Sequence, residues 1–307
     1  MTPLPSLKQL HYLVAVATHL NFTRAAESCF VTQSTLSAGL RELDATLGAR
    51  LVERNRQSVL MTPLGEEIAR RARALLTEAE DLVRIATEAS ESLHRTVRLG
   101  IIPTIAPFLL PGLLAQVSAR YPGLQLLLRE DRTAELLQRL DDGRLDFALM
   151  ALPYDTGQRR VETLFEDPLW LLGRAGDPAL NSPETSADEI LQKLLLLEEG
   201  HCLREHSLSA CGRKEKASSD IEATSLLTLV QMVESGLGYG LLPEMAVRCG
   251  VARSPKLALR PFSGGHPGRT IALVTRATSP HPAEFSALAE LLRALHASET
   301  PTVTTAA

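Results

Sequence analysis

The first sixty residues carry apolar positions at helical spacing, separated by short polar turns. Two stripes repeat every three or four positions: Leu7, Leu10, Val14 and Ala17, and then Leu36, Leu40, Leu43 and Leu47. Asn21 and Thr32 are suited to cap the second and third of three helices, and Gly48 to end the third. Residues 50–60 mix apolar and basic side chains and favour a small β-wing. The pattern predicts three short helices followed by a wing.

A longer helix is predicted to begin at Thr62-Pro63, a capping residue followed by proline at the first helical position. Its apolar positions form a seam in which small residues alternate with larger ones: Ile68, Ala72, Leu75, Ala79, Leu82, Ala86 and Ala89. Small residues allow two helices to approach closely, so the seam favours a dimerisation helix. The alternative is a helix packed on its own domain.

From Arg95 onward, short apolar strands alternate with helices. We expect strands at 97–102, 124–129, 145–152, 169–172, 194–197 and 270–274, and helices at 108–119, 134–140, 226–234 and 283–295. Such alternation is typical of an α/β domain with largely parallel sheets. The pattern does not decide between one large domain and two small ones.

Composition and charge exclude several classes. The chain has 307 residues, 45% of them hydrophobic, and a net charge of −4, so neither a disordered chain nor a uniformly basic nucleic-acid binder fits. The net charge of residues 1–60 differs in sign, because this segment contains six basic and four acidic residues. Residues 99–117 are uncharged, but Pro103, Pro107 and Pro111 exclude a membrane helix. With no evident signal peptide, we expect a cytoplasmic protein with no membrane contact.

The third predicted helix begins with a set of polar residues suited to DNA. These are Thr32, Gln33, Ser34, Thr35, Ser37 and Arg41. The second helix of a helix-turn-helix lies in the major groove, where such side chains contact bases or phosphates. Arg54 and Arg56 of the wing are placed to hold the DNA backbone. The alternative is an ordinary three-helix unit with a solvated polar face.

Two of the four cysteines lie nine positions apart, Cys202 and Cys211. Cys202 follows His201 and precedes Arg204, and cationic neighbours and a helix N-terminus favour the thiolate that attacks peroxide. If the segment is helical, the two cysteines are about 13.5 Å apart along the axis, whereas a disulfide needs Cα atoms within about 7 Å. A bond would then require refolding. Inert buried thiols, a metal site with His201 and His206, and a thiol peroxidase remain alternatives.

The N-terminal residues resemble the winged helix-turn-helix of LysR-type transcriptional regulators. The similarity lies in residues 22–27 (FTRAAE), 31–37 (VTQSTLS), 42–43, 47–48 and 51–54 (LVER), and residues 62–65 (TPLG) resemble the start of that family's linker helix. Many members carry proline where this chain has Ser34. The resemblance implies double-stranded DNA as a partner, and an α/β effector domain of two subdomains that resembles a periplasmic binding protein.

Residues 200–204 (GHCLR), with Cys211 following, resemble the redox segment of the peroxide-sensing OxyR branch of this family. Residues 100–104, 109–111, 223–226 and 236–243 fit the same branch. The resemblance implies that hydrogen peroxide oxidises Cys202, that Cys211 resolves the product as a disulfide, and that the peroxide pocket includes Thr104, Thr133, His201 and Arg269. Thr133 could instead cap a helix, and Arg269 could form a surface ion pair.

The resemblance also implies a homotetramer built as a dimer of dimers, which acts with RNA polymerase to activate antioxidant genes. It implies a sensor rather than an enzyme, with no cofactor and no metal. Cys29 and Cys249 are expected to be bystanders. A LysR-type regulator of a small organic effector, with incidental cysteines, is the alternative.

We expect four segments on these grounds. They are a winged helix-turn-helix DNA-binding domain (1–61), a linker helix (62–92), a redox-sensing α/β domain (93–298) and a frayed tail (299–307), the α/β domain being divided into subdomain I (93–166 and 269–298) and subdomain II (167–268).

Overall fold

A computed structural model describes residues 4–54, 59–88, 93–181, 190, 192–212, 222–262 and 268–298. The chain forms two compact units: residues 1–90 with 141–143, and residues 91–140 with 144–307. Of the predicted features, Ala89, Arg56 and the tail lie outside the described residues, as do the side chains of Arg54 and Ala86.

The first unit opens with three helices, α1 (Leu7–His19), α2 (Phe22–Ser28) and α3 (Gln33–Leu47). The predicted caps are confirmed: the Asn21 side chain accepts hydrogen bonds from the backbone N–H groups at the start of α2, and Thr32 does so for α3. Gly48 ends α3 in the left-handed conformation that glycine adopts without strain. The apolar stripes of the helices form a common core.

The predicted wing is a two-stranded antiparallel sheet of β1 (Val52–Arg54) and β2 (Val59–Met61). Helix α4 (Pro63–Glu88) follows, and the Thr62 hydroxyl accepts a hydrogen bond from Gly65 N–H at its start. The seam of α4 serves two roles. Ala72 is buried in the core of this unit, whereas Leu75 and Leu82 are exposed. The start of the seam therefore packs on its own unit, Ala79 is half-buried, and Leu75 and Leu82 leave an exposed apolar surface on this unit.

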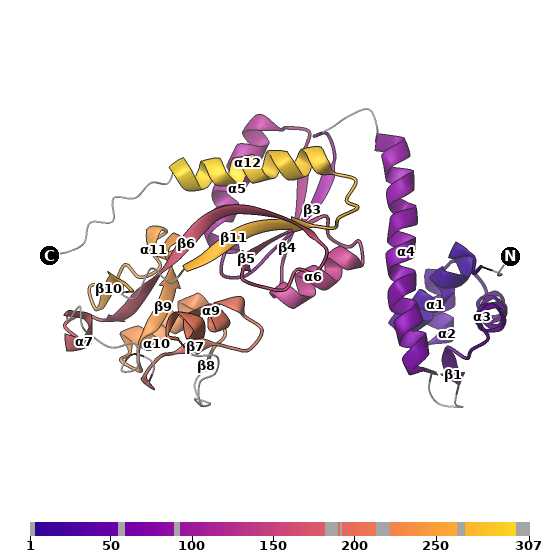
Figure 1. Cartoon of the computed structure of the whole chain (residues 1–307), viewed down its shortest axis with the longest axis horizontal. Coiled ribbons are helices and arrows are strands. Elements are labelled where there is room, and N and C mark those ends of the chain that lie inside the picture. Colours follow the sequence, from indigo (N-terminus) through magenta and orange to yellow (C-terminus); the bar gives the residue numbers. More distant parts are fainter. Residues whose placement is uncertain are drawn as a thin grey trace. The chain divides into compact units, whose positions relative to one another are not determined.

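The second unit is built on a seven-stranded sheet whose main path runs β10-β6-β11-β5-β3-β4 (Figure 1). The strands of its first half are β3 (Thr96–Ile101), β4 (Gln125–Glu130), β5 (Phe147–Leu152) and β11 (Gly268–Thr275). The helices beside them are α5 (Ala106–Arg120), α6 (Thr133–Asp141) and α12 (Pro282–Ser298). Helices α5 and α12 pack against each other along one side of the sheet (Figure 1).

Strand β6 (Arg160–Arg174) runs from this half of the unit into the second half (Figure 1). There it pairs with β9 (Gly240–Pro243) and β10 (Leu257–Pro261). The other elements of the second half are α7 (Pro178–Asn181), β7 (Leu196–Leu197), α9 (Cys202–Ala210), β8 (Glu222–Ala223), α10 (Leu226–Glu234) and α11 (Glu244–Arg248). One apolar core extends through both halves.

The expectation of largely parallel sheets is wrong. Strand β3 pairs in parallel with β4 and β5, but β11 and β6 are antiparallel to their neighbours. The reason is that β6 leaves the first half and β11 returns to it, so the two run side by side in opposite directions. Sequence patterning located only the end of β6, because its first residues alternate polar and apolar positions less clearly.

Among the described residues, no helix combines the length and the apolar character that a membrane crossing requires.

Candidate functional site

The polar residues expected to meet DNA gather at the start of α3. Thr32, Gln33, Ser34, Thr35 and Arg41 are exposed, whereas Leu36 between them is buried. Ser37 is half-buried on the same helix. The geometry presents short donors and acceptors together with one cation at the N-terminal end of the second helix of a helix-turn-helix.

Three hydroxyl groups at this end of α3 are joined by hydrogen bonds. The Thr32 hydroxyl lies 2.9 Å from that of Ser34 and 2.8 Å from that of Thr35, and it also accepts a hydrogen bond from Thr35 N–H. Ser34, for which the family resemblance led us to expect a proline, therefore has a hydrogen-bond partner at the start of α3. Its hydroxyl adds a donor and acceptor to the surface that proline would lack.

The second constellation surrounds Cys202, the first residue of α9. Gly200 turns the chain into this helix with φ +87°, in the left-handed region. Cys202 is only 6% exposed, and the side chains of Thr104, Thr133 and Arg269 are also buried. Arg269 and Thr133 both act on the thiol's pKa, and Thr104 binds Arg269 directly. The structure therefore brings four of the predicted residues, from α6, α9, β11 and the turn after β3, to one place.

Arg269 is the most firmly held of these groups. Its Nε and Nη2 each lie 3.0 Å from the same carboxylate oxygen of Asp167, which is paired with Arg269 on the neighbouring strand β6. Its Nη1 and Nη2 donate to the hydroxyl and the carbonyl oxygen of Thr104, at 2.6 and 2.9 Å. Asp167 also accepts a hydrogen bond from Met245 N–H. Arg269 is thus a buried cation in a fixed position, and not the surface ion pair that was the alternative.

Sequence reasoning missed Asp167. A buried guanidinium needs a carboxylate partner, so a predicted buried Arg269 could have prompted a search for one. The sequence offered no way to choose, because the partner lies 102 positions earlier and is reached only through pairing of β11 with β6.

Burial raises the pKa of the Cys202 thiol above its ordinary value. The Arg269 guanidinium and then the Thr133 hydroxyl lower it, Glu205 raises it, and the Leu203 backbone N–H lowers it slightly, and burial outweighs them. The Thr133 hydroxyl makes no hydrogen bond of ordinary geometry, so its action on the thiol is a close polar approach. Because Thr133 is the first residue of α6, the capping alternative does not apply.

The expectation that adjacent cations favour the Cys202 thiolate is wrong in its details. Arg204 binds Glu222 and the carbonyl oxygen of Leu197 instead. Burial and then the nearby Arg132 lower the pKa of His201, which disfavours a cationic imidazole beside the thiol. The cation that acts on the thiol is Arg269, from a distant part of the sequence.

Cys211 lies at the other end of α9, where it forms the C-cap. It is buried, and burial raises the pKa of its thiol. Both cysteines are free thiols, and α9 fills the whole interval between them. A nine-residue separation along a helix corresponds to about 13.5 Å, beyond the reach of a disulfide.

The metal alternative gains no support from the geometry. Burial lowers the pKa of His206 to about 4, with Arg269 adding to the shift. Within the described residues, no three histidine, cysteine, aspartate or glutamate side chains gather as a metal site requires. Of the other two cysteines, Cys29 packs against the helical core, and the exposed Cys249 has its thiol 3.9 Å from the Phe108 carbonyl oxygen.

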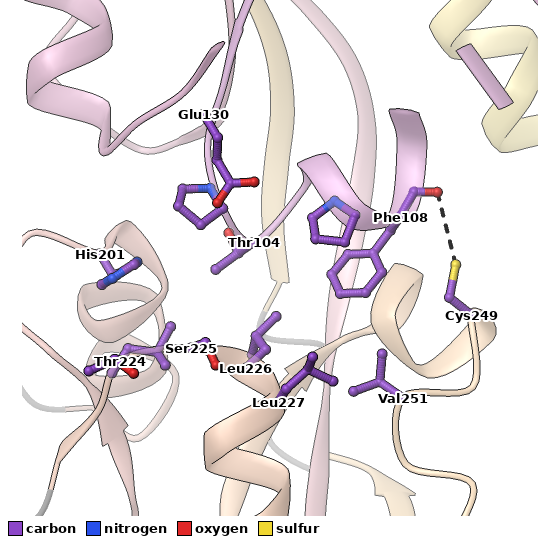
Figure 2. A pocket seen from close by; sticks show the side chains of 13 residues that line it. Thr104, Phe108, Glu130, His201, Thr224, Ser225, Leu226, Leu227, Cys249 and Val251 are labelled. Carbon is purple, nitrogen blue, oxygen red and sulfur yellow. Dashed lines mark hydrogen bonds between the residues drawn. The ribbon is translucent and has the colours of Figure 1, made fainter. Parts of the chain in front are cut away.

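A cavity of about 440 Å³ adjoins the thiol cluster. Figure 2 shows Thr104 between His201 on one side and Phe108 on the other, with Leu226, Leu227 and Val251 opposite. Its largely apolar lining comes from the turn after β3 and the start of α5, from the last residues of β4 and β7, and from the N-cap of α9. The segment after β8, the start of α10 and the residues that follow α11 complete it.

The sequence of the chain matches the profiles of two known protein families. The profile of the bacterial regulatory helix-turn-helix of the lysR family matches residues 7–66, and that of the LysR substrate-binding domain matches residues 90–297. The chain belongs to the LysR family of transcriptional regulators. The expected family and fold class are therefore confirmed, including the winged helix-turn-helix and the effector domain.

This LysR-family chain is similar to regulators with different names. It is 45% identical to the HTH-type transcriptional regulator EstR of Acinetobacter baylyi, over 97% of this chain and 99% of the relative. It is 38% identical to the DNA-binding transcriptional dual regulator OxyR of Escherichia coli, over 94% and 95%. It is 40% identical to a probable hydrogen peroxide-inducible genes activator of Streptomyces viridosporus, over 94% of each.

Among solved structures, a full-length OxyR variant from Pseudomonas aeruginosa superposes with a TM-score of 0.73, at 35% identity over 94% of each chain. An OxyR variant from Corynebacterium glutamicum with hydrogen peroxide bound gives a TM-score of 0.64, at 32% identity over 97% of this chain and 95% of that one. The LysR-family chain is thus similar in sequence and fold to OxyR proteins over nearly its whole length.

Proposed function

We propose that this chain is a hydrogen-peroxide-sensing regulator that activates antioxidant genes through a redox-active pair, Cys202 and Cys211. The Cys202 thiolate attacks one peroxide oxygen, the O–O bond breaks, and the departing hydroxide takes up a proton to give water. The sulfur becomes a sulfenic acid. The Cys211 thiol then attacks this sulfur, a disulfide forms, and a second water leaves.

The observation that carries the proposal is the buried cluster around Cys202. Arg269 is fixed there by Asp167 and Thr104, so its charge needs no rearrangement when negative charge develops on the leaving oxygen. Thr104, Thr133 and His201 supply further polar groups for a small ligand. The site would act as a sensor that reacts once per signal rather than as a turnover enzyme, because the chain belongs to a family of transcriptional regulators.

Formation of the disulfide must unwind α9, because the helix holds the two cysteines too far apart. Leu203 and Leu208 lie on α9 and are buried, and they lose this packing when the helix unwinds. A local chemical change therefore becomes a rearrangement of the regulatory domain.

In this proposal residues 1–61 bind double-stranded DNA and residues 62–92 join two copies, with 93–298 sensing peroxide. The base and phosphate contacts come from Thr32, Gln33, Ser34, Thr35, Ser37, Arg41, Arg54 and Arg56. The exposed Leu75 and Leu82 of α4 support a helix–helix contact between copies. The functional assembly is a homotetramer, a dimer of dimers, that acts on RNA polymerase in the cytoplasm, where the DNA is.

The test is peroxide titration of the reduced full chain, followed by disulfide mapping. Micromolar peroxide should join Cys202 to Cys211 and change the protein's contacts on promoter DNA. Cys202→Ser should abolish both effects, and Cys211→Ser should leave a sulfenic acid on Cys202. Absence of the bridge in wild-type protein would refute the proposal and favour a regulator of a small organic effector with incidental cysteines. Full peroxide-induced transcription from Cys202→Ser would refute it equally.

A further inference from the structure

His206 is a buried imidazole that the proposed peroxide chemistry does not use. It lies on α9, between the two cysteines, and is only 6% exposed. Within the described part of the chain, neither of its ring nitrogens has a hydrogen-bond partner of ordinary geometry. A neutral imidazole has one donor and one acceptor, and most such groups are paired when they are buried. The reduced chain is therefore destabilised by the burial of two unpaired polar atoms.

The surroundings of the ring also oppose its protonation. Burial, and then the Arg269 guanidinium from β11, lower the pKa of His206 to about 4. The Pro153 backbone, which follows β5, counteracts this shift only in part. In the reduced chain the imidazole thus remains neutral in mild acid, where an exposed histidine binds a proton.

The acidic groups around the ring do not supply the missing negative charge. The Asp167 carboxylate is bound to Arg269, and Glu205, which precedes the imidazole on α9, is exposed to solvent. Burial raises the pKa of the Cys202 thiol and of the Tyr154 hydroxyl, so both favour their neutral forms. The reduced site therefore holds one fixed cation and resists a second one.

Formation of the disulfide changes these surroundings, because α9 must unwind. The helix fills the interval between Cys202 and Cys211, and a disulfide needs their Cα atoms within about 7 Å. His206 lies near the middle of this interval, so unwinding removes it from its buried position. In water the imidazole regains both hydrogen bonds and an ordinary pKa of about 6.5.

We propose that His206 biases the Cys202/Cys211 pair toward the disulfide, because its burial destabilises the reduced state alone, and that acid strengthens this bias. The inference rests on the proposed function and adds a determinant of its redox equilibrium. In acid the released imidazole binds a proton that the buried one does not, so the disulfide form is stabilised further. The bias opposes that of Leu203 and Leu208, whose packing on α9 stabilises the reduced state.

The experiment equilibrates the full chain with glutathione buffers and a trace of glutaredoxin as catalyst. The ratio of disulfide to dithiol is read by alkylation and peptide mass spectrometry. Glutathione disulfide is reduced to two glutathione thiols while the protein's two thiols become one disulfide, so the sulfur chemistry exchanges no net proton with solvent below about pH 7. Any dependence of the ratio on pH in this range therefore comes from another titrating group.

At pH 7, His206→Leu should lower the ratio of disulfide to dithiol by about tenfold, equivalent to a rise of about 30 mV in the midpoint potential. Leucine is of similar size and leaves no polar atom unpaired. Ser279→Ala is the matched control. The Ser279 hydroxyl is also buried and unpaired among the described residues, but it lies between β11 and α12, outside the bridged segment. This variant should leave the ratio unchanged.

Acidity provides a readout that a change in packing alone does not move. From pH 7 to pH 5 the ratio of disulfide to dithiol should rise more in wild type than in His206→Leu, by about twentyfold, since the pKa of His206 is about 4 when buried and about 6.5 when released. Burial also lowers the pKa of His201, but this residue is present in both proteins, so its contribution cancels.

Three results would overturn the inference. The first is a ratio in His206→Leu equal to or above that of wild type at pH 7, and the second is a shift of the same size in Ser279→Ala. The third is a wild-type ratio that stays flat between pH 7 and pH 5, which needs no variant. If the Cys202–Cys211 bond still forms in wild type, the proposed function stands although the inference fails. If neither glutathione disulfide nor hydrogen peroxide forms that bond, both fail.

Discussion

Leu208→Ala should make the Cys202/Cys211 pair easier to oxidise. Leu208 lies on α9, between the two cysteines, and is 4% exposed in the reduced chain. It belongs to the apolar core of the domain. Since the disulfide forces α9 to unwind, this burial stabilises the reduced state only. Removing it therefore shifts the equilibrium toward the disulfide.

The magnitude follows from the burial. Truncating a buried leucine to alanine costs about 2–5 kcal/mol. For a two-electron couple, about 1.4 kcal/mol corresponds to about 30 mV. The midpoint potential should therefore fall by up to about 40–110 mV, with the upper end reached if the oxidised state does not bury residue 208 at all.

The assay is equilibration of the chain in a series of thiol–disulfide buffers, with the disulfide fraction read by alkylation and mass spectrometry. Leu229→Ala is the control, since Leu229 is equally buried but lies on α10, outside the bridged segment. It should lower the free energy of unfolding without shifting the potential. An unchanged or higher potential in Leu208→Ala would refute the idea that α9 packing opposes the disulfide.

Three further predictions test the site and the DNA surface. Because burial holds the pKa of Cys202 above its ordinary value, only the small thiolate fraction reacts at pH 7, and the oxidation rate should rise about tenfold per pH unit up to that pKa. Arg269→Met leaves the Asp167 carboxylate buried without its cation and should lower the free energy of unfolding by about 3–5 kcal/mol, whereas adding Asp167→Leu should restore most of the loss. Arg41→Ala should weaken binding to promoter DNA. If Arg41 binds phosphate, the plot of log affinity against log salt concentration should also become less steep, its slope changing by about one.

Each of these has a clear contrary result. A rate that is flat between pH 7 and 9 would mean that the thiolate is already fully formed, contrary to the direction of the pKa shift. Equal instability of the single and double variants would show that Asp167 does not depend on the cation. Wild-type affinity and salt dependence in Arg41→Ala would remove Arg41 from the DNA surface, and urea unfolding would confirm that the variant is folded.

Local features were readable from the sequence because their causes are local. The caps at Asn21 and Thr32, the end of α3 at Gly48 and the start of α4 at Thr62 depend on residues within one helical turn. Helix α10 spans residues 226–234 as its apolar period predicts. The resemblance of short motifs further indicated which side chains to watch, Cys202 and Arg269 among them.

The direction of the strands could not be read in this way. Whether β11 runs parallel or antiparallel to β5 depends on where the chain re-enters the sheet, and an apolar run has no directional information. The exposure of Leu75 and the burial of Ala72 on one seam likewise follow from where the helical core ends, and not from the heptad pattern.

The sequence by itself determined a helix-turn-helix with a polar recognition face, a long helix after it and a cysteine pair whose helical spacing forbids a bond. Only the tertiary structure decided which cation serves the thiol. Arg204, two positions away, is bound by Glu222, whereas Arg269 reaches the thiol through the pairing of β11 with β6 and is held there by Asp167. The reason is that electrostatic interactions depend on distance and burial in space, which neighbours in sequence do not specify.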